Sequence, residues 1–162
     1  MHILHKLGGM LPANVTYTIY NGIDALPHFN PVLDNDNPAE TFNIFRTAVQ
    51  QADAVIVCSP EYAFGVPGVL KNALDWTVFA GSFNTKPAAV VTASSVGNNA
   101  HASLLLTFKA LGAVIPLHCE LLVPFVRTKV GEQGEITDSE LLKVFEVLIQ
   151  NLLQAAEGNK QD

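Results

Sequence analysis

The sequence predicts an α/β protein built on a doubly wound parallel sheet in three layers, α/β/α. Short apolar runs rich in β-branched residues alternate with longer segments of helical periodicity, which is typical of right-handed β-α-β units. Hydrophobic residues make up 49% of the chain and charged residues only 15%, as suits a sheet that helices cover on both faces. The 162 residues fit a single domain, 1–162.

The amino-terminal third contains a helix, a strand and a long loop. Residues 2–11 follow a helical pattern that ends near Pro12. Residues 15–20 alternate β-branched and aromatic side chains and therefore predict a strand. Residues 24–37 are punctuated by Pro, Asn and Asp, which indicates a loop.

The middle of the chain supplies the clearest strand. Asn37 can cap a helix whose first position is Pro38 and which runs to about Gln51. Residues 54–58 are a continuous apolar run, which predicts a buried parallel strand. A second helix is expected from Gly68 to Phe79, because Val69, Ala73, Trp76 and Phe79 recur at helical spacing.

The carboxyl-terminal half repeats this alternation. Residues 87–93 predict a strand, residues 100–111 a helix and residues 114–123 a last strand. Thr137 and Glu140 have the spacing of a capping box, which would open a final helix that reaches about Ala155. We expect residues 54–58, 87–93 and 114–123 to form adjacent parallel strands. Residues 15–20 are expected on the other side of 54–58, separated from it by the position of one strand that has no counterpart in this sequence.

The charge balance excludes several partners. The formal net charge is -6, and the nine Lys and Arg residues do not cluster, so nucleic acid and anionic membranes are not expected partners. No apolar run approaches the roughly 18 residues of a membrane helix. The start lacks the features of a secretory signal, and we expect a cytoplasmic protein.

The most informative segment follows the strand 54–58. It reads Ser-Pro-Glu-Tyr-Ala-Phe-Gly-Val-Pro-Gly-Val-Leu-Lys-Asn-Ala-Leu-Asp-Trp over residues 59–76. A Pro- and Gly-rich loop with aromatic residues at the carboxyl end of a parallel strand is where doubly wound sheets hold planar ligands. The segment closely resembles the signature of the NADPH-dependent FMN reductase family.

This resemblance implies a flavodoxin-like strand order, FMN as cofactor, and NADPH or NADH as electron donor. In that family the first loop lies along the isoalloxazine ring and a small-residue loop after the next strand contacts it. For the first loop the alternative is a rigid strand-to-helix turn without a ligand, and for the second loop it is an ordinary Ser-Gly turn. The positions that inherit the cofactor-binding role are Pro60, Glu61, Tyr62, Ala63, Phe64, Ser94, Ser95, Val96 and Gly97.

No residue is predicted to act as a catalytic acid or base, because the flavin itself carries the hydride chemistry. The Glu61 carboxylate is expected to cap a nearby helix or backbone amide instead. The five histidines are scattered, so no metal site is predicted. Cys58 and Cys119 are interpreted as small apolar core residues.

The sequence differs from the family pattern at its amino-terminal end. Family members begin with a strand and a phosphate-binding loop, whereas this chain begins within the first helix, so we expect it to be amino-terminally truncated relative to them. Without charge-assisted phosphate contacts, FMN binding by this chain is expected to be weak or absent. Restoring an upstream strand and phosphate-binding loop should recover tight binding.

Three functions are compatible with these observations. The first is an FMN-dependent NAD(P)H oxidoreductase that passes electrons to quinones, azo compounds, metal oxyanions or free flavin. The alternative is a truncated, non-catalytic relative that acts as an oligomerising or binding module without flavin; an electron-transfer flavodoxin fits the signature less well. The resemblance further implies a homodimer or a dimer of dimers, with Val69–Phe79 in or near the interface.

Overall fold

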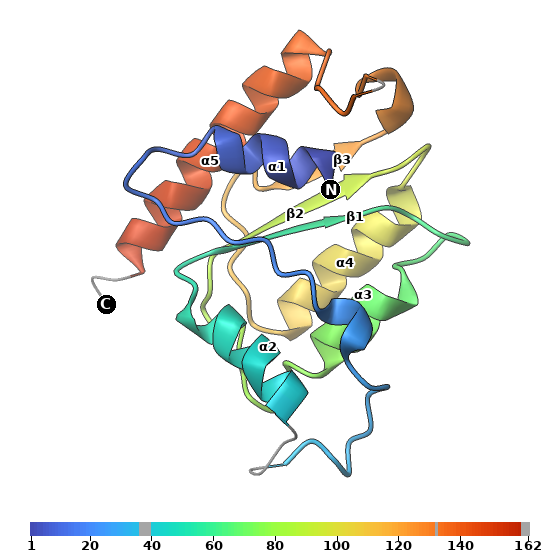
Figure 1. Ribbon diagram of the computed structural model, residues 1–162, viewed down its shortest axis with the longest axis vertical. Coiled ribbons are helices and arrows are strands. Elements are labelled where there is room, and N and C mark those ends of the chain that lie inside the picture. The colour runs from blue at the N-terminus through green and yellow to red at the C-terminus, as the bar shows by residue number, and fades with distance from the viewer. Residues whose placement is uncertain (36–39, 132, 160–162) are drawn as a thin grey trace.

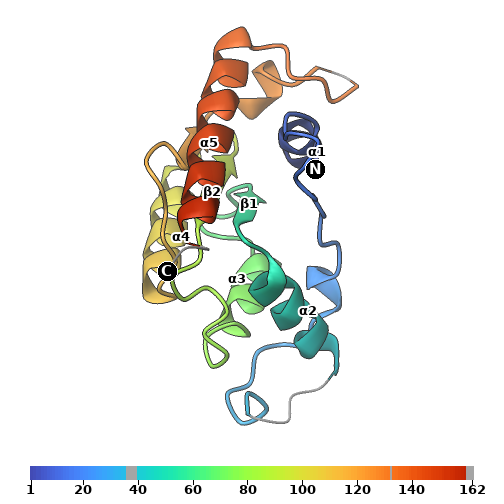
Figure 2. The ribbon, with the colours of Figure 1, turned by 90° about the vertical axis from the view of Figure 1, so that its left-hand side faces the viewer.

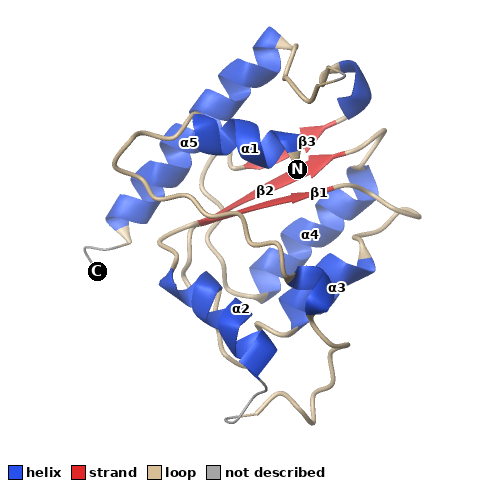
Figure 3. Ribbon diagram, viewed as in Figure 1, coloured by secondary structure: helices blue, strands red, loops and turns tan. Residues whose placement is uncertain are grey.

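The computed structural model describes residues 1–35, 40–131 and 133–159 and shows a three-layer α/β/α arrangement (Figure 1). Three strands form the middle layer, as Figure 3 shows: β1 (Val55–Ser59), β2 (Ala88–Ala93) and β3 (Glu120–Val123). The helices are α1 (His2–Gly9), α2 (Glu40–Gln51), α3 (Gly68–Asp75), α4 (Asn98–Ala110) and α5 (Ser139–Gly158). Two short 3-10 helices, η1 (Ile23–Ala25) and η2 (Val126–Thr128), lie in connecting segments.

The central strand β2 is buried on both faces. Ala88 and Val90 pack into a core with residues of α2, α3 and α4, whereas Ala89 and Val91 pack into a second core with residues of α1 and α5. All four side chains are fully shielded from solvent. Because successive strand residues point to opposite faces, this alternation produces the two helical layers. The predicted three-layer architecture is confirmed.

The sheet order is β1-β2-β3, and both pairings are parallel. This confirms that 54–58, 87–93 and 114–123 are adjacent and parallel. The third strand is shorter than predicted, because it pairs only through a single bridge at Val114 before β3 begins. Pro116 lacks an N–H group and His118 has a left-handed φ of 62°, so the chain bulges out between the two pairings.

The prediction of a strand at Val15–Tyr20 is wrong. In the described part of the chain this segment forms no β bridge, and β1 pairs only with β2. Its burial still alternates, with Tyr17 half-buried between exposed threonines, and the Tyr17 hydroxyl donates to the Leu4 carbonyl. Figures 1 and 2 show the segment running past the sheet. The side-chain pattern is that of a strand, but among the described residues this segment pairs with no neighbouring strand.

Helix boundaries differ from the predicted ones by a few residues. α1 ends at Gly9, α3 ends at Asp75 rather than Phe79, and α5 extends to Gly158. The N-cap of α5 is Asp138, whose carboxylate accepts from the Leu141 amide, and not Thr137, whose own amide bonds to the Lys129 carbonyl. The hydrogen bond from the Leu141 amide lowers the pKa of the Asp138 carboxyl. The predicted cap and first position of α2, Asn37 and Pro38, lie outside the described residues.

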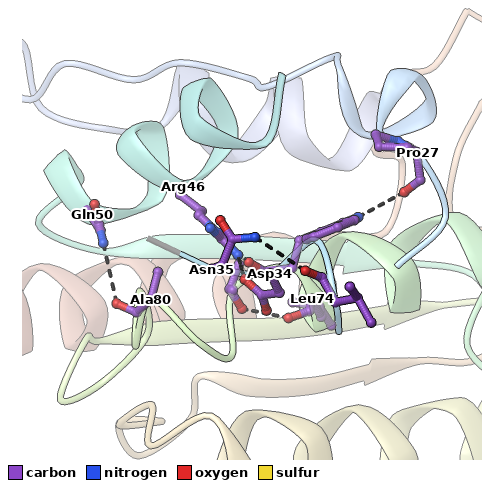
Figure 4. A network of polar contacts seen from close by, with 10 residues as sticks. Pro27, Asp34, Asn35, Arg46, Gln50, Leu74 and Ala80 are labelled. Atoms are coloured by element: carbon purple, nitrogen blue, oxygen red, sulfur yellow. Dashed lines mark hydrogen bonds and ion pairs between the residues drawn. The ribbon is translucent and has the colours of Figure 1, made fainter. Parts of the chain in front are cut away.

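Trp76 is a core residue, not an interface residue. It is fully buried, stacks on Phe42 with ring centroids 4.0 Å apart, and donates from its indole nitrogen to the Pro27 carbonyl at 2.8 Å. The Arg46 guanidinium crosses the same cluster, where Nε donates to the Trp76 carbonyl and Nη2 pairs with the Asp34 carboxylate (Figure 4). This network fastens the loop between η1 and α2 to the helical layer.

Asp34→Ala should lower the free energy of unfolding by about 3–5 kcal/mol, because it leaves a buried guanidinium without its carboxylate. Urea unfolding followed by tryptophan fluorescence measures the change. The double variant Asp34→Leu/Arg46→Met should lose clearly less, since it removes both charges. An equal loss in the single and double variants would show that packing, not charge pairing, dominates at this site.

Candidate functional site

Two predicted loops leave the sheet at its carboxyl edge, side by side. Because β1 and β2 are parallel neighbours, the segment after β1 (Pro60–Val66, here the β1 loop) and the segment after β2 (Ser94–Gly97, the β2 loop) emerge at the same edge (Figure 1). Each connects its strand to the following helix, α3 or α4. The sequence prediction that these loops are neighbours is therefore confirmed.

The β1 loop contains a tight left-handed turn. The backbone amides and carbonyls of Tyr62 and Gly65 bond to each other at 3.0 and 2.9 Å. Between them, Ala63 and Phe64 have φ values of 48° and 57°, a conformation that costs non-glycine residues about 1–2 kcal/mol each. The turn leaves Tyr62 67% and Phe64 80% exposed, so two aromatic rings stand at the edge of the sheet without protein cover.

The β2 loop is held by its neighbours. The Ser94 amide donates to Val123, and the Ser94 and Ser95 carbonyls accept from Val126 and Phe125. Phe125 itself lies just after β3, is 64% exposed and has a left-handed φ of 52°. The sequence analysis did not single it out, although its place after the third parallel strand is a signal that could have identified it.

Gly97 ends the β2 loop in a conformation that other residues rarely adopt. Its φ is 97°, and a Cβ at this position would lie 2.9 Å from Leu122 Cδ1 and 3.1 Å from Thr92 Cγ2. Glycine therefore allows the chain to turn from β2 into α4 while staying close to the sheet.

The Glu61 carboxylate points to a helix and not into open space. Its Oε2 accepts from the Ala100 amide, in the first turn of α4, at 2.8 Å. The prediction that Glu61 caps a helix is confirmed. The bond also connects the β1 loop to the helix that follows the β2 loop.

The two loops offer neutral hydrogen-bond donors. The amides of Ala63, Phe64, Ser95 and Val96 donate to no acceptor in the described part of the chain, and all four residues are exposed. Neither loop contains Lys or Arg. Neutral N–H groups beside exposed aromatic rings suit a flat ligand with acceptor atoms along its edge, such as a flavin ring. The residues present therefore fit the ring of the implied cofactor.

Below the β2 loop, His101 of α4 is placed by Thr92. Its Nδ1 lies 3.0 Å from the Thr92 hydroxyl, which is fully buried at the end of β2. Burial lowers the pKa of His101, and the Glu120 carboxylate partly opposes this effect. The neutral imidazole is therefore the favoured form, and it serves as a packing and hydrogen-bonding group at the start of α4.

The signature residues on α3 serve the structure. Asn72 accepts from the Phe29 amide at 2.7 Å and donates to the Pro27 carbonyl, so it holds the same loop that Trp76 anchors. Lys71 and Asp75 pair across one turn on the outer surface. Asn72 therefore supports the loop between η1 and α2, whereas Lys71 and Asp75 remain on the surface.

Neither cysteine is an activated nucleophile. Burial raises the pKa of both the Cys58 and Cys119 thiols to about 11. In the described ranges, no three His, Cys, Asp or Glu side chains come together as metal ligands would. No helix among the described residues has both the length and the apolar character needed to cross a membrane.

The strand order, the two helical layers and the open carboxyl edge define a flavodoxin-like α/β protein with a candidate site for a planar ligand. A model of the NADPH-dependent FMN reductase family matches residues 3–128, and the chain belongs to this family.

Known proteins resemble the chain over different lengths. It is 33% identical over 102 residues to a 2-hydroxy-1,4-benzoquinone reductase from a Burkholderia species, covering 59% of this chain and 52% of that protein. It is 34% identical over 95 residues to a quinone reductase of Pseudomonas putida, covering 57% and 50%. The chain thus spans about half the length of these curated relatives. Among solved structures, the NAD(P)H:(acceptor) oxidoreductase FerB of Paracoccus denitrificans superposes with a TM-score of 0.78 at 26% identity, over 97% of this chain and 87% of FerB.

Gly97→Ala should lower the free energy of unfolding by about 1–3 kcal/mol, because the new methyl group overlaps Leu122 and Thr92 at an unfavourable φ. Thermal or urea unfolding measures the loss. Gly81→Ala is the matched control, since Gly81 also has positive φ (57°) but has no atom within 4 Å of the added Cβ. Equal losses in the two variants would mean that backbone strain alone accounts for the effect.

Proposed function

We propose that the β1 and β2 loops form the flavin-ring site of an FMN-dependent NAD(P)H oxidoreductase. The observation that carries the proposal is the combination of exposed Tyr62 and Phe64 rings with unbonded amides on both loops, at one edge of the sheet. In this proposal Pro60, Ala63, Ser94 and Gly97 shape the slot, and Tyr62 and Phe64 form its wall. No side chain is assigned as a catalytic acid or base.

The cofactor would supply the redox chemistry. FMN held by these loops would supply hydride acceptance from NADH or NADPH and electron transfer to an acceptor. The relatives named as quinone reductases support a quinone as acceptor, and a 34% identical NADPH azoreductase of a Bacillus species supports azo compounds. Metal oxyanions and free flavin are further acceptors in this proposal.

The ring and the phosphate group of FMN should contribute to its affinity through different interactions. Because neither loop carries a positive charge, these loops would recognise the ring through stacking and neutral hydrogen bonds. Charge-assisted phosphate contacts contribute about 1.5–3 kcal/mol each, and a site without them loses roughly one to two decades of affinity per contact. We therefore expect this chain to bind FMN weakly.

Lumiflavin, which has the ring but no phosphate, should bind this chain within about tenfold of the affinity of FMN, and both dissociation constants should be micromolar or weaker. Flavin fluorescence quenching on titration with protein measures both. Phe64→Ala should weaken both ligands by about two- to tenfold, because it removes one aromatic wall. Nanomolar FMN binding with far weaker lumiflavin binding would contradict a ring-centred site.

The second candidate is a non-catalytic binding or assembly module. The absence of Lys and Arg from both loops favours this candidate, because these loops offer no positive charge to hold the phosphate group of a cofactor. The two candidates separate in one measurement. Flavin absorbance in the purified protein, or saturable flavin binding, supports the enzyme, and no binding at millimolar flavin supports the module.

A homodimer, or a dimer of dimers, is part of the same proposal. Val69, Val78 and Phe79 lie on or just after α3 and are 42%, 58% and 57% exposed, so three large apolar side chains of this segment lack cover within the subunit. Trp76 takes no part, because its own subunit buries it completely.

Phe79→Glu should shift the protein from dimer to monomer, because a carboxylate in an apolar interface has no partner. Light scattering coupled to size-exclusion chromatography at micromolar concentration measures the mass. Val147→Glu is the control, since Val147 is 41% exposed on α5, which packs on the other face of the sheet. A monomeric mass for the unsubstituted protein would contradict the proposal.

A further inference from the structure

One side chain of the β1 loop, that of Glu61, bonds to α4. Between its ends, Tyr62, Ala63 and Phe64 are all exposed, so none of their side chains fixes the loop to the core. The bond from the Ala100 amide to Glu61 Oε2 joins this loop to α4, and no other hydrogen bond in the described ranges does so. The loop is otherwise held where it meets buried Ser59 at one end and half-buried Val66 at the other.

The other end of this bond is well fixed. Ala100 is fully buried in the first turn of α4. Gly97 packs against Leu122 and Thr92, and the Thr92 hydroxyl bonds to His101. The start of α4 is therefore a rigid support, and the Glu61 carboxylate accepts a charge-assisted bond from it, a type roughly twice as strong as a neutral one.

We propose that Glu61 is a positioning residue, which sets the separation of the β1 and β2 loops and thereby the affinity for the flavin ring without touching it. The inference rests on the proposed function. A flat ligand has to meet the amides of Ala63 and Phe64 and those of Ser95 and Val96 at the same time. Its affinity therefore depends on the distance between the β1 loop and the start of α4, which among the described residues are joined by the Glu61 hydrogen bond.

The proposal distinguishes Glu61 from the rest of the turn. Phe64 acts through contact with the ring, and its removal takes away a surface. Glu61 acts through its bond to α4. Its removal leaves the groups that contact the ring in place, but the separation of the two loops is no longer fixed. Glutamine should replace it well, because the Gln side-chain oxygen also accepts from the Ala100 amide.

The test compares three variants by lumiflavin and FMN titration, followed by fluorescence quenching. Glu61→Ala should raise both dissociation constants by about tenfold, since small misplacements of binding groups cost this much or more. Glu61→Gln should stay within about threefold of the unsubstituted chain. Asp138→Ala is the control, because it also removes a side-chain bond to a helix-terminal amide, at α5, while the partners of Asp138, Leu141 and Lys129, lie outside both loops. It should leave both constants unchanged.

A second readout follows the bond itself. In the amide spectrum recorded by nuclear magnetic resonance, the Ala100 proton should move upfield in Glu61→Ala and keep most of its position in Glu61→Gln. Hydrogen exchange of Ala100 should become faster in Glu61→Ala only. These signals do not require bound flavin.

The outcomes separate the inference from the proposed function. If the unsubstituted chain binds neither flavin, the proposed function fails, and the inference with it. If it binds and Glu61→Ala binds equally well, the inference is wrong and the proposed function stands. The inference is also overturned if Asp138→Ala weakens binding as much as Glu61→Ala. Failure of Glu61→Gln to rescue, with the Ala100 bond intact, would show that the carboxylate contacts the ligand directly.

Discussion

The complete burial of β2 is the constraint on which the rest of the structure depends. Its residues Ala88–Val91 are shielded on both faces, so each face requires its own layer of helices. On each face one alanine is followed by one valine, and these small side chains let α4 and α5 pack on the sheet. The same strand places its carboxyl end between those of β1 and β3, so the β2 loop lies at the middle of the sheet edge and its neighbours flank it. Parallel pairing on either side of this buried strand thus brings the segments that follow β1, β2 and β3 to the same edge.

Most of the fold follows from local pattern in the sequence, and its exceptions have physical causes. The runs at 54–58 and 87–93 predict strands because they are short, largely apolar and contain β-branched residues, with polar or Pro residues on either side. Val15–Tyr20 carries an equally good pattern, yet strand formation requires a partner with free backbone groups, which a pattern does not reveal. Thr137 offers a correct capping box, but a backbone bond to Lys129 commits it to the preceding turn, and Asp138 caps instead.

The candidate site, too, can be predicted from the sequence only in part. The positions of the β1 and β2 loops follow from parallel pairing, so the sequence predicts that Tyr62 and Val96 lie at one edge. The partner of Glu61 does not follow, because Ala100 is 39 residues away and meets it only after both strands are in register. The bonding partners of Asn72 and Trp76 are also hidden in the sequence, because their bonds go to Pro27 and Phe29, more than 40 residues away. Much of the segment that carries the family resemblance therefore builds the support of the site and not its surface.

The left-handed turn at Ala63 and Phe64 indicates how such a site would bind. Two non-glycine residues in this conformation cost about 1–2 kcal/mol each, whereas an aromatic contact with a ligand returns only about 0.5–1.5 kcal/mol. A ligand could not induce the turn at that ratio, so the protein itself has to stabilise it before any ligand arrives. The paired bonds between Tyr62 and Gly65 close the turn, and the Glu61 bond to α4 fixes its base. Strain that the fold already bears is absent from the free energy of binding, and the exposed phenylalanine is then a preorganised surface.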